Sequence, residues 1–347
     1  MSTPNDVGRR TSSGQGSFWS ALKTHSDSRK TVTHSPESGR KIFRNSIGTL
    51  YSGVLHGVKY FLPDSVFLFL SHRRRVGRFP NLRNPATFNE IILDRCLHPD
   101  PLWSMLADKL AVREYVKEKI GEKYLIPLIA VPDVFTQEVF DTLPESFVMK
   151  ANHGCGFVKV VWNKADVSFG ELQQLADQWL STDFSVASRE RHYRPIKPRI
   201  YFEKLLTDRS GKVPPDYKIN IFDREQGEPV IYTGVVSDRF GTPHHDFYDT
   251  QWNPLHIAAA GYPCSDDPAG RPPNWGEVVD IATRLSEGLG YVRVDLYAYD
   301  NEIFFGELTF TPGAGVTRFS QDSFDYEWGQ LIRTMPSSRE ANFVRKS

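Results

Sequence analysis

The stretch YVRVDLYAYDNEIFFGELTF (residues 291–310) predicts a β-hairpin, because two runs rich in β-branched and aromatic residues flank a short polar segment. Successive side chains of a strand point to opposite faces of its sheet. Arg293, Asp295 and Tyr297 are therefore expected on one face of the first strand. The hairpin thus presents a charged surface of defined composition.

The second strand presents Glu307 and Thr309 on one face, and the turn decides whether they meet the polar residues of the first strand. A three-residue turn over residues 300–302 places Asp295 opposite Glu307 and gathers all five side chains on one surface. A two-residue turn would put the two carboxylates on opposite faces. A shared surface therefore requires a turn of odd length.

Such a surface has the composition of a magnesium site. Mg²⁺ binds hard oxygen ligands, usually one or two carboxylates together with substrate phosphates. Arg293 beside the carboxylates would stabilise a phosphoryl group during its transfer. A solvated strand face with a cross-strand ion pair has the same spacing, so both interpretations remain open.

The charge and cysteine content exclude some classes of protein. The 347 residues include 42 Lys and Arg and 42 Asp and Glu, so net charge gives no general argument for a nucleic-acid partner. The three cysteines, Cys96, Cys155 and Cys264, are far apart and form no Cys-x-x-Cys pair. This usage favours a reducing, cytoplasmic compartment.

The N-terminal part of the chain is polar and then briefly apolar. Residues 1–45 are rich in Ser, Thr, Arg and Lys and lack the apolar core of a signal peptide, so we expect a disordered leader. The longest apolar run, residues 60–70, is interrupted by Pro63 and Asp64 and is too short to span a bilayer. Basic residues 72–75 follow it. The segment is therefore either a peripheral membrane contact or a buried amphipathic helix with a solvated basic end.

Helical and strand patterns along the rest of the chain predict an α+β fold. Thr87 and Glu90 have the spacing of a capping box at a helix start. A second helix is expected over residues 101–120, with Gly121 ending it. Further helices are expected at 169–180 and 278–289, and strands at 124–131, 147–151, 157–162, 199–206, 217–222 and 230–236.

A glycine loop follows one of these strands, in Lys150-Ala-Asn-His-Gly-Cys-Gly156. A lysine at a strand end, followed by glycines, can place a point charge and backbone N–H groups around phosphates. Most such segments are simple turns. Cys155 has no evident acid–base partner, so we do not expect a nucleophile there, and His153 is expected to contact the loop or a substrate.

Three further polar stretches leave alternatives open. The strand around Glu203, with the return through Asp216 and Lys218, suits an adenine slot with a ribose contact, but edge strands have the same composition. The basic stretch 189–199 could hold an anionic substrate or form a solvated face. The His-His-Asp at 244–246 could bind a metal, although adjacent histidines rarely converge.

In this order, the segments resemble the TupA-like branch of the ATP-grasp superfamily, named for teichuronopeptide biosynthesis. The resemblance covers residues 80 to about 330. Its most specific motifs are Val292-Arg-Val-Asp-Leu-Tyr297 and Gly306-Glu-Leu-Thr-Phe-Thr-Pro-Gly313. The others are Asn84-Pro-x-Thr-Phe-Asn-Glu90, Leu106-Ala-Asp-Lys109, Val112-Arg-Glu-Tyr-Val116, Lys150-x-Asn-His-Gly154, His192-Tyr193, Lys197-Pro-Arg199 and Asp216-Tyr-Lys218.

The resemblance implies two α+β lobes that clasp ATP, preceded by a helical region. We expect a leader at 1–45, an N-terminal helical region at 46–122, a first lobe with the phosphate lysine at 123–206, a second lobe with the metal-binding hairpin at 207–335 and a tail at 336–347.

The resemblance also implies nucleotide-binding residues. Arg113 and Lys150 stand where the family places two phosphate-binding basic residues, and Glu203 and Leu206 stand at the hinge that meets adenine. Asp216 lies near the position of the ribose-binding acid. The remaining expected nucleotide contacts are His153, Gly154 and Lys218.

The catalytic end of the site is implied in the same way. Asp295 and Glu307 match the magnesium carboxylates, and Arg293, together with Lys150, matches the residues that act on the acyl-phosphate. Thr309 departs from the asparagine common in the superfamily. It keeps an oxygen ligand but offers one fewer hydrogen-bonding group.

The activity implied by the resemblance is an ADP-forming, Mg²⁺- and ATP-dependent carboxylate–amine ligase. Its partners would be ATP, a carboxylate such as a sugar acid or an amino acid, and an amine, with no nucleic acid. Its expected setting is surface-polysaccharide or related conjugate synthesis. A kinase acting on a sugar or other hydroxyl and a non-catalytic nucleotide-binding protein remain alternatives.

Overall fold

The computed structural model describes residues 61–335, except 225–226, 238–243, 260 and 267–269. The expected leader (1–45) and tail (336–347) lie outside the described residues. All of the described residues belong to one unit, residues 53–347.

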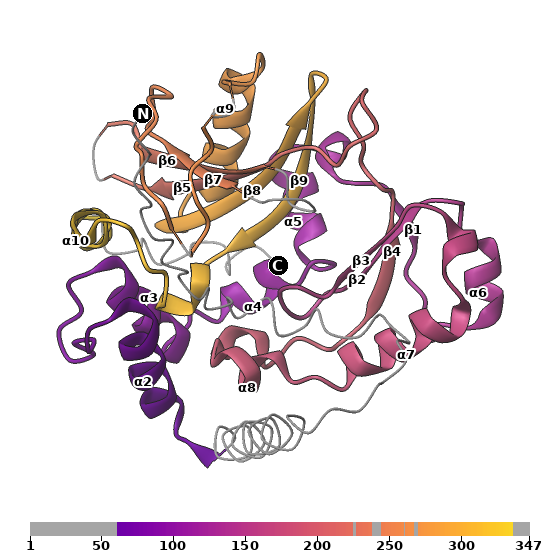
Figure 1. The fold of residues 1–347 in the computed structure, drawn as a ribbon, viewed down its shortest axis with the longest axis horizontal. Helices are drawn as coiled ribbons and strands as arrows, with labels where there is room; N and C mark the ends of the chain where they lie inside the picture. The colour runs from indigo at the N-terminus through magenta and orange to yellow at the C-terminus, as the bar shows by residue number, and fades with distance from the viewer. Residues whose placement is uncertain (1–60, 225–226, 238–243, 260, 267–269, 336–347) are drawn as a thin grey trace, which may run out of the picture. The chain divides into compact units, whose positions relative to one another are not determined.

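Two antiparallel sheets form the frame of this unit (Figure 1). The first has the strand order β1 (Leu128–Ala130), β4 (Ile200–Glu203), β2 (Phe147–Ala151) and β3 (Val158–Val161). The second has the order β7 (His244–Tyr248), β6 (Val230–Ser237), β5 (Asp216–Phe222), β8 (Tyr291–Tyr299) and β9 (Glu302–Thr309). Together with the helices between them, these sheets confirm the predicted α+β fold.

Helices supply the apolar side chains that bury one face of each sheet. The core of the first sheet is closed by α6 (Gln137–Thr142), α7 (Phe169–Leu180) and α8 (Phe184–Ser188). The core of the second sheet is closed by α9 (Trp275–Ser286), which buries Ile281 and Leu285 against β5 and β8. The charged face of β8 and β9 is therefore left on the side away from α9.

The N-terminal helices form a third core with the C-terminal helix. The helices α2 (Asp64–Val76), α3 (Phe88–Leu97) and α10 (Asp322–Arg333) pack around the Trp328 indole. The predicted capping box at the start of α3 is confirmed, because Glu90 N donates to Thr87 Oγ1 at 3.3 Å and Thr87 N donates to Glu90 Oε2 at 3.1 Å. Among the described residues, none of the helices combines the length and apolarity needed to cross a bilayer.

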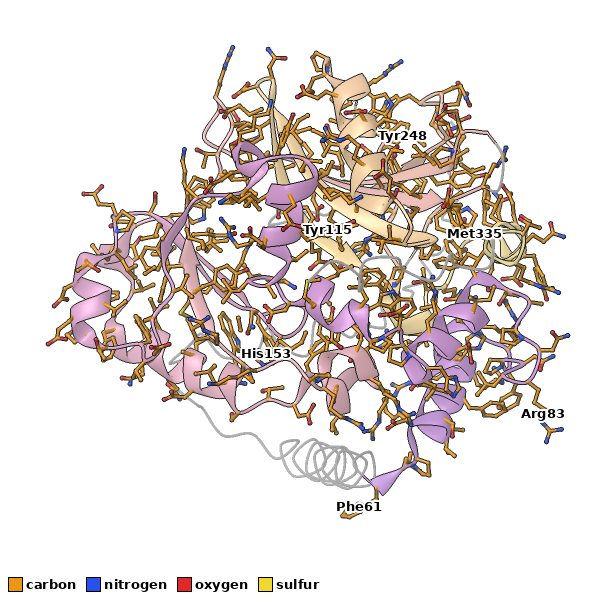
Figure 2. The ribbon with its side chains drawn as sticks, turned by 180° about the vertical axis from the view of Figure 1, so that it is seen from behind. Phe61, Arg83, Tyr115, His153, Tyr248 and Met335 are labelled. Atoms are coloured by element: carbon orange, nitrogen blue, oxygen red, sulfur yellow. The ribbon has the colours of Figure 1, made fainter. Side chains whose placement is uncertain are left out.

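The single helix predicted over residues 101–120 is wrong, because the structure has α4 (Leu102–Ala107) and α5 (Val112–Lys119). Asp108 separates them with an extended backbone at ψ 113°. Its Oδ1 accepts from Leu110 N at 2.8 Å and from Ala111 N at 3.2 Å, so the side chain replaces helical hydrogen bonds and starts a new helix. Tyr115 of α5 (Figure 2) then donates to the Leu285 carbonyl of α9 at 2.9 Å.

Short connections account for other differences from the predicted elements. The predicted strand at 124–131 is a 3₁₀ turn followed by the short strand β1, and β7 was not predicted. The 3₁₀ helices are η2 (Glu122–Tyr124), η3 (Lys164–Asp166), η4 (Arg191–Tyr193) and η5 (Pro312–Gly315).

The β8–β9 hairpin corrects the predicted turn but keeps the predicted pair. Asp300 and Asn301 form a two-residue turn with φ of 50° and 66°, so the three-residue turn is wrong. The register then shifts at Gly306, an extra residue of β9 that forms a β-bulge. Asp295 therefore lies opposite Glu307, as the shared charged surface requires.

Candidate active site

Asp295 lies on the charged face of the second sheet and accepts hydrogen bonds from two cations. Arg293 donates from Nε to Asp295 Oδ1 at 2.6 Å and from Nη2 to Asp295 Oδ2 at 2.7 Å. Lys218 Nζ, from the neighbouring strand β5, donates to Asp295 Oδ2 and to Asp216 Oδ2, both at 2.7 Å. Burial raises the pKa of Asp295, and the cations of Arg293 and Lys218 oppose that shift.

Glu307 completes this network from β9. Thr309 Oγ1 donates to Glu307 Oε1 at 3.2 Å, and Arg293 Nη2 lies 3.1 Å from Thr309 Oγ1 and 3.4 Å from Glu307 Oε1. Lys109 Nζ lies 3.0 Å from Glu307 Oε2. Burial alone would raise the pKa of Glu307, but the cations of Lys109 and Arg293 hold it well below its usual range. Glu307 is therefore an ionised carboxylate.

Lys109 is a member of the network that sequence reasoning missed as a site residue. The break between α4 and α5 directs it away from the helices, and Lys109 N donates to the Asn152 carbonyl at 3.2 Å. Its Nζ donates to the Gly154 carbonyl at 2.8 Å while pairing with Glu307. One side chain thus joins the N-terminal region, the glycine loop and the hairpin. Its presence in the family motif was the available signal.

We expect Lys109→Met to lower the free energy of unfolding by about 2 kcal/mol, because it leaves the partly buried Glu307 carboxylate without one of its cations. We also expect the ATP turnover implied by the family resemblance to fall by about two orders of magnitude, since the glycine loop would lose its link to Glu307. Chemical denaturation and steady-state kinetics measure the two effects. Lys119→Met is the matched control, because Lys119 pairs with the exposed Glu287 at 2.9 Å. Equal turnover in the two variants would remove Lys109 from the site.

The first sheet carries a second ionic group. Lys150 of β2 forms an ion pair with Glu203 of the adjacent strand β4. Arg113 on α5 is half-buried; burial lowers the pKa of its guanidinium and the nearby Glu203 carboxylate opposes this. Leu206, just beyond β4, is buried in a small apolar cluster with Ile126 and Phe304. Charged and apolar predicted residues therefore gather at one end of β4.

Two of the predicted residues, His153 and Gly154, lie in the glycine loop after β2 and have different surroundings. His153 Nε2 lies 3.1 Å from the Trp179 carbonyl, and its ring packs 5.0 Å from that of Phe157 (Figure 2). His153 therefore contacts the body of the first lobe. A Cβ on Gly154 would lie 2.7 Å from the Phe184 ring, so close packing requires glycine there.

Carboxylates of the two ionic groups raise the pKa values of neighbouring side chains. Burial raises the pKa of Tyr201 on β4 well above its usual value, and the carboxylates of Glu203 and Glu307 add to the shift. Burial likewise raises the pKa of the Cys155 thiol to about 11, with Glu307 adding to it. Cys155 is therefore a neutral thiol at neutral pH.

The hard-oxygen groups at the hairpin fit a magnesium ion. Asp295 and Glu307 supply two carboxylates and Thr309 a hydroxyl, the kind of set that Mg²⁺ takes when phosphates and water complete its coordination. In the part of the chain that the structure describes, no three His, Cys, Asp or Glu side chains gather as a metal site. The three side chains at residues 244–246 do not share one face, because His245 points to the opposite face of β7 from His244 and Asp246.

Glu190 is a further carboxyl near the network that was not predicted as a site residue. In the sequence it lies within the basic stretch 189–199, which hides it. It lies between α8 and η4 and is 7% exposed. Thr311, two residues beyond Thr309, donates to Glu190 Oε1. Burial raises the pKa of Glu190 to about 7, and Thr311 opposes this shift while Glu307 adds to it. A titratable group thus lies beside the ionic network.

This carboxyl should make stability depend on pH. Its pKa in the folded state, about 7, lies above the ordinary value of 4.5, so its stabilising contribution is complete below pH 4.5 and is lost as the pH rises through 7. The loss should approach about 3 kcal/mol at higher pH, and Glu190→Gln should remove it. Denaturation curves between pH 4 and pH 8 measure the difference, with the exposed Glu228→Gln as control. Parallel pH profiles for wild type and Glu190→Gln would contradict the assignment.

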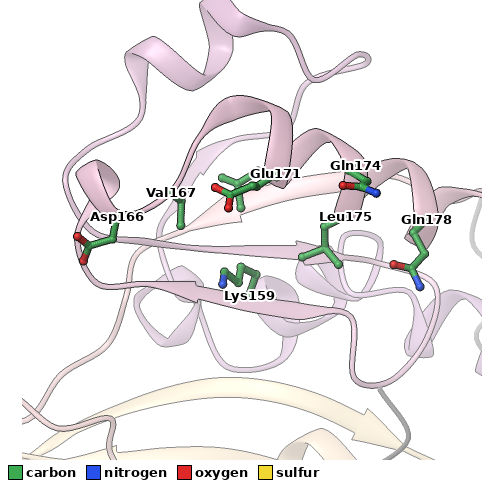
Figure 3. Close-up of a pocket in the computed structure, with 8 residues that line it drawn as sticks. Lys159, Asp166, Val167, Glu171, Gln174, Leu175 and Gln178 are labelled. Atoms are coloured by element: carbon green, nitrogen blue, oxygen red, sulfur yellow. The ribbon is translucent and has the colours of Figure 1, made fainter. Parts of the chain in front are cut away.

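A separate hollow lies between β3 and α7 (Figure 3). It has a volume of about 280 Å³, and none of the predicted site residues lines it. Its lining residues are Lys159, Asp166, Val167, Glu171, Leu172, Gln174, Leu175 and Gln178.

Comparison with known proteins gives a family and several distant structural neighbours. Residues 92–333 match the family model of TupA-like ATP-grasp proteins. No curated protein matches the chain. An N5-carboxyaminoimidazole ribonucleotide synthetase solved with ADP is 16% identical, with 60% of this chain and 46% of that chain covered and a TM-score of 0.37.

Two ligases of another kind are similarly distant. The D-alanine–D-alanine ligase from Helicobacter pylori is 13% identical, with coverage of 67% and 62% and a TM-score of 0.37. The enzyme of that name from Bacillus anthracis, complexed with ATP, is 15% identical, with coverage of 67% and 64% and a TM-score of 0.36. The match spans less than two thirds of each of these three chains. Because the family model spans well over half of the present chain, the protein belongs to the TupA-like ATP-grasp family, with the ATP-grasp fold that the resemblance predicted.

Proposed function

We propose that this protein is an ADP-forming carboxylate–amine ligase that uses Mg-ATP. The observation that carries the proposal is the placement of Asp295 opposite Glu307, with Arg293 in contact with Asp295, Glu307 and Thr309. Transfer of a phosphoryl group requires hard-oxygen ligands and a fixed guanidinium close together, as they are here.

ATP would lie between the two ionic groups. Lys150 and Arg113 would bind phosphates, as their positive charges near the end of β4 support. Glu203 and Leu206 would meet adenine, and the apolar surroundings of Leu206 support this contact. Gly154 would approach the phosphates through the loop backbone, with His153 holding the loop.

The phosphate end would extend onto the second sheet. Asp295 and Glu307 would hold Mg²⁺ with the Thr309 hydroxyl, and the ion would neutralise charge on the transferring phosphoryl group. Asp216 would contact the ribose, and Lys218, because it already contacts Asp295, would act at the phosphates.

The proposed reaction has two steps. A carboxylate oxygen of the substrate attacks the γ-phosphorus of ATP and ADP leaves, which gives an acyl-phosphate. An amine then attacks the acyl carbon, phosphate leaves with the electron pair of the broken C–O bond, and the amine loses a proton. Arg293 and Lys150 would stabilise the phosphate charge in both steps, and no enzyme nucleophile is needed.

Water must be kept from the acyl-phosphate, because hydrolysis would waste it. The contact of Lys109 Nζ with the Gly154 carbonyl supports a closed loop over the hairpin. By analogy with the branch named for teichuronopeptide biosynthesis, we place the reaction in the cytoplasm in surface-polysaccharide or related conjugate synthesis. The carboxylate would belong to a sugar acid or an amino acid.

Mass spectrometry tests the proposal. The protein is incubated with Mg-ATP, a panel of sugar acids and amino acids, and a panel of amines, with single-substrate mixtures as controls. A product equal to the two substrates minus water, formed with ADP and phosphate, is the expected result. A phosphorylated substrate as the stable product would favour a kinase, and tight ATP binding without turnover across the panel would favour a non-catalytic protein.

A further inference from the structure

Large apolar side chains are exposed just before α2, on one face of α2 and in the turn after it. Phe61, at the start of the described chain, is 87% exposed (Figure 2), Leu70 is 50% exposed and Phe79 is 57% exposed. Val66 precedes Leu70 by one helical turn and is 41% exposed. The opposite face of the helix buries Leu68 in the third core. One face of α2 therefore packs against the third core, and the other face exposes apolar side chains to solvent.

Arginines follow Leu70 on α2, and one of them contacts Phe79. Arg73, Arg74 and Arg75 form the last turn of α2 and all three are exposed. The Arg73 guanidinium lies 5.4 Å from the centroid of the Phe79 ring and donates to the Gly77 carbonyl at 2.7 Å. Aromatic and aliphatic side chains next to a basic row are typical of helices that lie in the interface of an anionic membrane.

The distribution of charge along the chain points the same way. Residues 1–78 contain thirteen Lys and Arg and only four Asp and Glu, although the whole chain is balanced at 42 of each. Residues 1–78 thus carry a strong positive excess, and residues 79–347 carry the matching negative excess. Basic residues close to an anionic surface are attracted to it at short range, so this positive excess favours binding to such a surface.

The same helix is attached to a segment that borders the ionic network. Arg191 Nε donates to Asp64 Oδ2, at the start of α2, at 2.8 Å, and the Arg189 guanidinium lies 5.0 Å from the Phe67 ring. Between these arginines lies Glu190, which binds Thr311 at the end of the hairpin. A membrane on the exposed face of α2 would therefore lie near the Glu190 side of the network.

We propose that the exposed face of α2 and the following turn bind the surface of an anionic phospholipid bilayer. Phe61, Leu70 and Phe79 enter the interface, and Arg73 and Arg74 contact lipid phosphates. The apolar side chains favour a bilayer over a nucleic acid, because a bilayer buries Leu70 and Phe79 while a phosphate backbone would leave them in water.

Flotation of the full chain with vesicles tests the proposal. Two preparations are compared, phosphatidylcholine alone and phosphatidylcholine with about 30 mol % phosphatidylglycerol, at low and high salt. We expect flotation only with the anionic vesicles and less of it at high salt. The double variant Arg73→Gln/Arg74→Gln should lower the partition coefficient about tenfold or more, since each basic residue adds to attraction near such a surface.

An apolar variant and matched controls distinguish binding by this surface from nonspecific electrostatic or hydrophobic adsorption of the protein. Phe61→Ser/Leu70→Ser should also reduce flotation, whereas Val134→Ser/Trp162→Ser, which alters apolar side chains that are 69% and 51% exposed elsewhere, should not. Lys117→Gln/Lys123→Gln removes two exposed charges outside α2 and should have little effect. Circular dichroism checks that each variant is folded.

Several results would overturn the proposal. Absence of flotation with anionic vesicles is one, and flotation that both α2 variants leave unchanged is another. Size-exclusion chromatography supplies a third: if the α2 variants convert a dimer into monomers without changing flotation, the surface contacts a second copy and not a membrane.

Discussion

Glu307→Gln is expected to lower ATP turnover by about three orders of magnitude, because it removes the charge on which the network converges. The carboxylate accepts from Thr309 and lies within 3.4 Å of both Arg293 Nη2 and Lys109 Nζ. The amide has one oxygen in place of two, and its NH₂ group would face a cation or a hydroxyl donor. A divalent ion would also lose one of its two charged ligands. Turnover is measured as ADP release at saturating Mg-ATP.

The control for this variant lies on the same strand. Glu302→Gln changes an exposed carboxylate at the hairpin turn and should leave turnover within about twofold, as expected for a surface substitution. Because Glu307→Gln also leaves Lys109 with less compensation, unfolding should be measured in parallel. Undiminished turnover of a folded Glu307→Gln protein would refute the proposed role of Glu307 as a metal ligand.

Local signals in the sequence predicted much of the fold. The capping box of Thr87 and Glu90 and the strands at 147–151 and 291–299 depend on residues that are close in sequence, and all are confirmed. The break at Asp108 depends on a distant partner, because Asn152 Nδ2 donates to Asp108 Oδ1 at 3.0 Å. A helical period cannot reveal such a contact, so residues 101–120 were predicted as one helix.

The candidate site was predictable where alternation alone placed its residues. Strand period put Arg293 beside Asp295, and the structure places them in contact. Lys109 and Glu190 join the network through tertiary contacts with Glu307 and Thr311, which no spacing in the sequence indicates.

The glycine loop and β7 also depend on tertiary contacts that the sequence does not indicate. His153 was predicted to contact the loop or the nucleotide, and the structure places its Nε2 3.1 Å from the Trp179 carbonyl of α7, with its ring packed against Phe157. The strand β7 is polar in sequence, at His244-His-Asp246, and becomes a strand through its pairing with β6. Both outcomes depend on neighbours that are remote in sequence.

The bulge at Gly306 is the feature on which the site geometry depends most. A two-residue turn followed by a regular ladder would place Asp295 opposite residue 306 and turn Glu307 to the other face of the sheet. The extra residue corrects this offset. A Cβ on Gly306 would lie 2.9 Å from the Asp295 carbonyl oxygen, which is backbone and cannot move aside cheaply. Glycine therefore permits the close approach that the bulge needs.

Gly306→Ala is expected to lower the free energy of unfolding by about 1–3 kcal/mol, because the added methyl forces the two strands apart. Turnover should fall further, by about two orders of magnitude, since a shift of about 1 Å between Asp295 and Glu307 disturbs the ligand geometry. Denaturation and ADP release measure the two effects. Gly276→Ala is the matched control: Gly276 lies in α9 with open space around its Cβ position, so alanine should stabilise the helix by about 0.5–1 kcal/mol and leave turnover unchanged. If Gly306→Ala behaves like this control, the bulge does not set the spacing of the two carboxylates.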